Sequence, residues 1–194
     1  MDLWKLYLRW RHSKGFGVHS PYAYRFVTDV LRPGPYRYYS YWEIEERLRG
    51  KERDDNDLVK LIRFTIRLAI FLKAKRIISH QGSARFAEVA AQCLHIPFIP
   101  LKKSESFVFG TADLLVMEGE TENPESLKKA IAAGTAVFVV NPRHEIRAII
   151  DNPIERGLLL RGKHRMILIP RQEMAYVAYD INLKGGDRRG FGDL

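Results

Sequence analysis

The chain of 194 residues contains a single cysteine, Cys93. One cysteine cannot form a disulfide within the chain, and the first residues lack the basic segment and apolar stretch of a secretory signal. We therefore expect a reducing, cytoplasmic location. No run reaches the roughly 18 apolar residues of a membrane span, because the most apolar helix candidate, residues 58–72, carries Lys60, Arg63 and Arg67. We expect no membrane-spanning segment.

Several short motifs are absent as well, namely H-E-x-x-H, C-x-x-C, Walker A, G-x-S-x-G and G-x-G-x-x-G. Their absence disfavours zinc sites, phosphate-binding loops and hydrolase nucleophiles, and we predict no metal site. Cys93 shares an apolar helix face with Phe86, Val89 and Ala90. This placement favours a core thiol over a nucleophile.

Positive charge is in excess, since 32 Lys and Arg residues stand against 23 Asp and Glu residues, for a formal net charge of +9. Such a balance favours contact with nucleic acid, anionic surfaces or acidic ligands. A solvated basic surface without any partner explains the same charge. The residues considered as an RNA-binding footprint are Lys60, Arg63, Arg67, Lys73, Lys75, Arg76 and the Arg188-Arg189 tail.

The first 55 residues predict a helical cap. Leu3, Leu6, Tyr7 and Trp10 have the spacing of an amphipathic helix with a basic opposite side. We expect this helix to pack on its own domain or on a second subunit, rather than on a membrane surface. The aromatic and apolar surface of the cap therefore makes a homodimer through the N-terminal helices possible.

Two further helices are expected in the cap. Ser20 is a good N-cap and Pro21 suits the first helical position. Ser40 and Glu43 form the S-x-x-E pattern of a capping box at the start of the next helix. A charged loop follows at 51–57. The next helix is then expected over 58–72, capped by Asn56 or Asp57.

Strand and helix patterns alternate after this point, which predicts an α/β fold with right-handed βαβ units, a largely parallel sheet and helices on both faces. The last third has strand patterns only, which predicts a closing antiparallel hairpin. We expect a cap over 1–55, a sheet domain over 56–183 and a flexible basic tail over 184–194. Strands are predicted at 76–79, 98–99, 113–117, 135–140, 158–160, 166–169 and 176–181, and helices at 84–94, 124–133 and 142–151.

Ligands of open α/β sheets bind beyond the carboxyl ends of the strands. After the first strand, the helix preceded by Ser83 offers free N–H groups to an anion, although an ordinary turn with Ser83 as N-cap explains the same pattern. After the third, Glu118 is a candidate base or cation ligand, or an ordinary exposed acid. After the fourth, His144 with Glu145 suggests acid–base chemistry, although Glu145 also complements the helix dipole.

Several stretches of the chain have the pattern of one known family. They are Gly17–Tyr22 with Phe26-Val27, Tyr39 and Ile44–Leu48 in the cap, Asp113–Gly119, and Met166–Ile169 with Tyr176–Leu183. In these stretches the chain resembles the class I S-adenosylmethionine-dependent methyltransferases of a Bacteroidetes type. The resemblance implies a Rossmann-like methyltransferase sheet beneath the N-terminal cap, and it implies that S-adenosylmethionine contacts Ser79, Gln81, Gly82, Ser83 and Glu118.

The departures from the family pattern fall on the cofactor site. Ser79 stands in the place of an acid, Gln81 and Arg85 stand where the family has glycines, and Arg85 is expected to crowd the cofactor. Leu101 is followed by Lys102 and Lys103 where an acid would hold the ribose. Only the 11 residues 102–112 precede the next strand, too few for the usual helix and strand. An Asp pair is replaced by Val140-Asn141-Pro142, and Glu118 alone remains.

Three functions follow from this comparison. The first is a methyltransferase-family protein with a degraded cofactor site, weak or inactive as an enzyme, that acts by binding an unidentified partner. The second is an active methyltransferase on an unidentified acceptor, in which Glu118 or His144 takes the proton. The third is a basic RNA-binding protein on the same fold, whose binding would depend steeply on salt.

Overall fold

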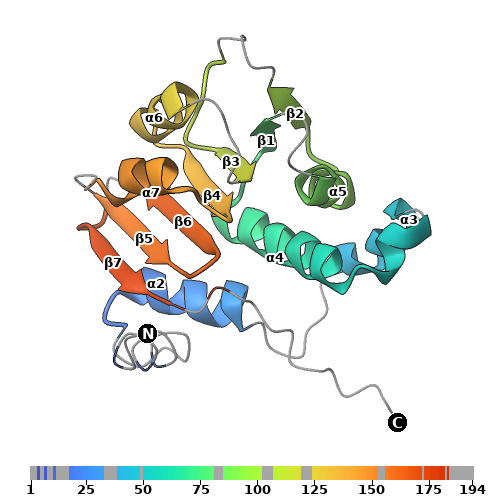
Figure 1. The fold of residues 1–194 in the computed structure, drawn as a ribbon, viewed down its shortest axis with the longest axis horizontal. Helices are drawn as coiled ribbons and strands as arrows, with labels where there is room; N and C mark the ends of the chain where they lie inside the picture. Colours follow the sequence, from blue (N-terminus) through green and yellow to red (C-terminus); the bar gives the residue numbers. More distant parts are fainter. Residues whose placement is uncertain are drawn as a thin grey trace.

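The computed structural model describes residues 4, 7, 11, 18–32, 39–48, 50–80, 85–101, 107–118, 124–152, 156–171, 173–181 and 183. Helices and strands alternate through its middle part, and three strands close the chain (Figure 1). The elements are α2 (Pro21–Phe26), η1 (Val27–Leu31), η2 (Tyr39–Tyr41), α3 (Trp42–Arg47), η3 (Gly50–Asp54), α4 (Asn56–Leu72), β1 (Arg76–His80), α5 (Arg85–Cys93), β2 (Phe98–Leu101), β3 (Asp113–Glu118), α6 (Pro124–Ala132), β4 (Ala136–Val140), α7 (His144–Asp151), β5 (Gly157–Arg161), β6 (Arg165–Pro170) and β7 (Val177–Asp180).

The strands form one seven-stranded sheet in the order β2-β1-β3-β4-β6-β5-β7. Strands β1 to β4 pair in parallel, so the predicted α/β fold with a largely parallel sheet is confirmed. The predicted antiparallel hairpin is formed by β5 and β6, and β6 also pairs antiparallel with β4. Strand β7 lies beyond β5 and runs parallel to it. Within the described sheet, β6 is thus the one strand that runs against the others.

Helices cover both faces of the sheet (Figure 1). The cap elements α2, η1 and α3 lie with α4 and α5 on one face, and their apolar side chains join one core with Leu114, Phe138 and Ile167. Helices α6 and α7 cover the other face, where Leu127 and Ile146 pack against the alternate strand residues. This alternation follows from the two-residue period of a strand, whose successive side chains point to opposite faces.

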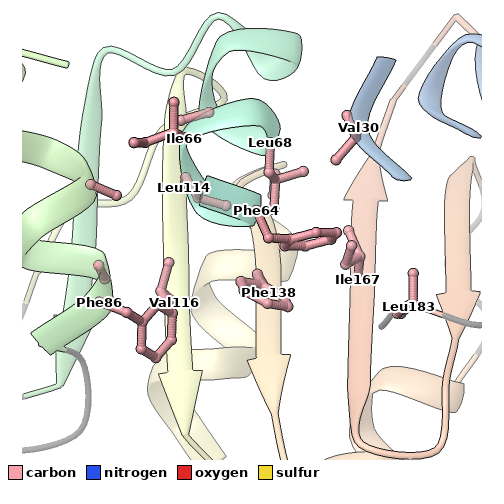
Figure 2. Close-up of a cluster of buried hydrophobic side chains, with 14 of the residues drawn as sticks. Val30, Phe64, Ile66, Leu68, Phe86, Leu114, Val116, Phe138, Ile167 and Leu183 are labelled. Carbon is pink, nitrogen blue, oxygen red and sulfur yellow. The ribbon is translucent and has the colours of Figure 1, made fainter. Parts of the chain in front are cut away.

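Phe64 of α4 and Phe138 of β4 lie at the centre of the first core, with ring centroids 5.1 Å apart (Figure 2). Phe86 of α5 meets Phe138 edge-on at 6.3 Å. All three rings are buried. Because the ring of Phe138 contacts both α4 and α5, it links these helices to the middle of the sheet.

The capping of α2 agrees with the prediction, and two other predicted caps are wrong. Ser20 accepts a hydrogen bond from the amide of Ala23 at 3.3 Å. The predicted capping box of Ser40 does not form, because a 3-10 turn shifts the start of α3 to Trp42. The carboxylate of Glu43 binds Arg47 of its own helix instead, at 3.2 Å.

Helix α4 begins at Asn56, and its cap is Asp55 rather than Asn56 or Asp57. The Asp55 carboxylate accepts from the amides of Asp57 and Leu58, both at 3.0 Å. Much of the expected charged loop at 51–57 is the 3-10 turn η3 and the first turn of α4.

Of the first predicted helix, Trp4, Tyr7 and Arg11 are described, and all three have helical backbone and exposed side chains. Leu3, Leu6, Trp10 and the 184–194 tail lie outside the described residues. No helix in the described ranges is long and apolar enough to cross a membrane.

A glycine at the β5–β6 turn allows a close backbone approach. The amide of Gly162 donates to the carbonyl of Arg165 at 2.9 Å, and a Cβ at Gly162 would lie 2.9 Å from that same oxygen. We expect Gly162→Ala to lower the free energy of unfolding by about 1–3 kcal/mol in a denaturant titration, because the backbone must move. Gly110→Ala is the matched control, since its Cβ would lie 3.7 Å from Asp113. Equal losses in both variants would refute this packing argument.

Candidate functional site

The carboxyl ends of the parallel strands β1, β2, β3 and β4 meet at one edge of the sheet, where the sequence predicts a site. Ser79 pairs with Val116, and Glu118 pairs with Val140. By strand alternation, Ser79 and Glu118 share the sheet face of Val116, which α4 and α5 cover. The sheet thus places these two candidates on one face of the predicted edge.

Ser79 is wholly enclosed, with 0% of its surface exposed. Its position at the end of β1 is the one predicted, but its hydroxyl is presented to the interior and not to solvent. Gln81, Gly82 and Ser83, the other candidates after this strand, lie outside the described residues. Ser79 is therefore the only member of this predicted group whose surroundings the structure describes.

Glu118 is half-buried at the last position of β3. Across Val140, the next strand places Arg165 on the same face of the sheet. The Arg165 guanidinium lies 5.6 Å from the ring centroid of Phe64 and donates to the carbonyl of Leu183 at 3.0 Å. Glu118 and Arg165 therefore flank the end of β4 on the face that α4 covers.

Burial lowers the pKa of Arg165, and the positive charge of Arg67 lowers it further. The negative charge of Asp57 acts in the opposite direction and raises it. Asp57 is in the first turn of α4, so this end of the helix brings one carboxylate toward Arg165. Arg165 is therefore a partly buried positive charge at this end of the sheet.

His144 and Glu145 form the exposed first turn of α7. This helix packs through Ile146 on the sheet face opposite to that of Glu118. The two candidate acid–base residues, Glu118 and His144, are thus on different faces at neighbouring strand ends. The fold does not join them into one catalytic pair.

Arg85 was expected to crowd the cofactor, but its guanidinium is held by the cap. It donates to Glu52 of η3 at 3.1 Å, to Glu88 at 3.0 Å and to the carbonyl of Arg47 at 3.2 Å. Hydrogen bonding to Glu52 is the main cause that raises the pKa of Arg85, and Glu88 adds to it. Arg85 therefore fastens the start of α5 to the N-terminal segment.

Arg67 is a member of the predicted RNA-binding footprint, yet only 1% of its surface is exposed. Its Nε donates to the carbonyl of Val30 at 2.7 Å, and its Nη1 donates to the hydroxyl of Tyr41 at 2.8 Å. That hydroxyl in turn donates to the carbonyl of Arg63 at 3.4 Å. Arg67 thus links α4 to η1 and to the cap.

The predicted RNA-binding footprint is not one solvent-facing surface. Arg67 is buried, and Arg76 is bound by the carboxylate of Asp113, with Nη2 and Oδ2 2.9 Å apart. Lys60 pairs with Asp57 at 3.1 Å. Lys73 and Lys75 are exposed at the other end of α4, and Arg188-Arg189 lies outside the described residues. Residues 62–69 of α4 are all buried except Arg63, which is half-buried. A charged residue in this helix is therefore not a sign of exposure.

Cys93 is buried in the core of α5, as predicted. Desolvation raises the pKa of its thiol to about 11. In the ranges that the structure covers, no three His, Cys, Asp or Glu side chains are grouped so as to hold a metal ion. Comparison with models of known protein families, with curated proteins and with solved structures finds no match to this chain.

Proposed function

We propose that this chain is a divergent protein of the S-adenosylmethionine-dependent methyltransferase type that acts by binding a macromolecule, not by methyl transfer. One observation carries the proposal: Glu118 is the only carboxylate in the last two positions of β1, β2, β3 and β4. Those positions are Ser79-His80 in β1, Pro100-Leu101 in β2, Met117-Glu118 in β3 and Val139-Val140 in β4.

These residues do not fit S-adenosylmethionine. The hydroxyl groups of a ribose are best bound by carboxylates at strand ends, whereas Leu101 is apolar and buried and Ser79 is enclosed. Each lost polar contact weakens binding by roughly 1–3 kcal/mol. Three such losses, at Ser79, after Leu101 and at the end of β4, then lower the affinity for S-adenosylmethionine by about two to six orders of magnitude. We therefore derive no chemical step through this cofactor.

An active methyltransferase on an unidentified acceptor is the alternative, and the position of Glu118 at the end of β3 favours it. That carboxylate is half-buried and lies on the sheet face that also carries Arg165. In this alternative, Glu118 holds the cofactor or accepts a proton from the acceptor.

Calorimetric titration with S-adenosylmethionine and with its demethylated product separates the two functions. We expect neither heat nor thermal stabilisation at ligand concentrations of about 1 mM. Micromolar binding would overturn the proposal and restore the enzyme. Glu118→Ala should then abolish that binding or lower turnover, and Glu145→Ala, which removes an exposed acid near the end of β4, is the matched control.

A further inference from the structure

Two loops far apart in the sequence form one basic surface at the carboxyl edge of the sheet. The first loop joins β4 to α7 and carries Arg143, with His144 following it as the first residue of α7, and the second joins β5 to β6 and carries Lys163 and His164. All four side chains are exposed. We call these four residues, together with Arg147 of α7, the edge surface.

Hydrogen bonds fix the two loops against each other. The amide of Asn141 donates to the carbonyl of His164 at 2.6 Å. Arg147 donates through Nε to the carbonyl of Pro142 at 3.2 Å and through Nη2 to the carbonyl of Lys163 at 2.7 Å. These bonds hold the backbones of the two loops together, so their basic residues lie on one surface.

The charge of these two segments is strongly one-sided. Residues 141–147 and 162–165 contain Arg143, Arg147, Lys163 and Arg165 against the single carboxylate of Glu145. Like charges at this density repel one another, and an anionic ligand relieves the repulsion. Guanidinium groups also match phosphate oxygens in geometry.

We propose that the edge surface binds the phosphate backbone of single-stranded RNA. Several separated cations along one edge fit a chain of phosphates better than one compact anion, and the net charge of +9 attracts such a polymer from a distance. The inference deepens the proposed function, on which it rests, by naming the partner of a protein that acts through binding.

The test measures fluorescence anisotropy of a labelled single-stranded RNA of about 20 nucleotides and mixed sequence, from about 50 to 200 mM salt. If the edge surface neutralises about three phosphates, a plot of the logarithm of the association constant against the logarithm of the salt concentration should have a slope of about −2. We expect Arg143→Glu with Lys163→Glu to weaken binding at least about tenfold and to flatten the slope.

Lys128→Glu with Lys129→Glu is the matched control, because both lysines are exposed on α6, the charge change is the same, and neither lies on the two loops. We expect it to keep binding within about threefold. Equal losses in both double variants would overturn the edge surface as the site. Thermal unfolding of each variant checks that it folds, and Arg143→Gln with Lys163→Gln, which removes charge without reversing it, must show an intermediate loss.

Two further outcomes would also reject the inference. The first is that the unmodified protein does not bind RNA even at the lowest salt concentration. The second is that it binds vesicles of anionic phospholipid but not RNA. These results are distinct from failure of the proposed function. That function fails if S-adenosylmethionine binds at micromolar concentration, and this can occur with or without RNA binding.

Discussion

Phe138→Ala is expected to lower the free energy of unfolding by about 3–5 kcal/mol, the range for a large aromatic side chain removed from a core. The ring of Phe138 is fully buried between Phe64 and Phe86 (Figure 2). Its loss leaves a cavity between α4, α5 and the middle of the sheet, which these two rings cannot fill without moving both helices. Denaturant titration followed by circular dichroism measures the change.

Phe138→Leu is the matched control for this cavity, because leucine keeps an apolar side chain of similar reach. We expect it to cost less than half as much as the alanine variant, since the residual cavity is smaller. Equal costs for leucine and alanine would mean that the shape of the ring, and not the filled volume, stabilises the core. A loss below about 1 kcal/mol in the alanine variant would contradict the central position of this ring.

Arg67→Ala is expected to lower the free energy of unfolding by about 3 kcal/mol, because it removes two charged hydrogen bonds from a buried site. The carbonyl of Val30 and the hydroxyl of Tyr41 then lose their guanidinium donor. The same substitution removes a positive charge that lowers the pKa of Arg165. The net result is dominated by the lost bonds, since the charge of Arg165 is partly offset by Asp57.

Arg67→Met distinguishes bonding from packing at this position. Methionine fills most of the volume of the arginine stem, but it cannot donate to the carbonyl of Val30 or to the hydroxyl of Tyr41. We expect Arg67→Met to recover less than half of the loss seen with alanine, because the two hydrogen bonds stay lost, and recovery of most of the loss would show that packing dominates. If methionine is as destabilising as alanine, the hydrogen bonds that join α4 to η1 and the cap outweigh packing.

The order of helices and strands could be predicted because residues that end a helix mark each change in the spacing of the apolar residues. Gly134 ends the pattern of α6, and the β-branched run that follows becomes β4. The start of α3 could not be predicted, because Ser40 has the right chemistry for a cap and the wrong backbone. Local preference and tertiary packing disagree at that point, and the 3-10 turn satisfies the packing of the cap.

The candidate site could be predicted only in part. Strand ends are visible in the sequence, so Ser79 and Glu118 were placed on the correct edge. Their exposure was not visible, because it depends on α4 and α5, which cover that face. The contacts of Arg85 with Glu52 and the approach of Arg147 to Lys163 link residues far apart in the chain, and no spacing rule encodes such pairs.

The place of β6 between β4 and β5 also sets an order of assembly. Strand β5 reaches the parallel part of the sheet only through β6, so it cannot dock until residues 165–170 have been synthesised. Val30 of η1 packs in the same core as Ile167 and Leu183 (Figure 2). On the ribosome, the side of η1 that meets Ile167 and Leu183 therefore stays open until almost the whole chain has been synthesised, whereas its bond to Arg67 of α4 can form much earlier.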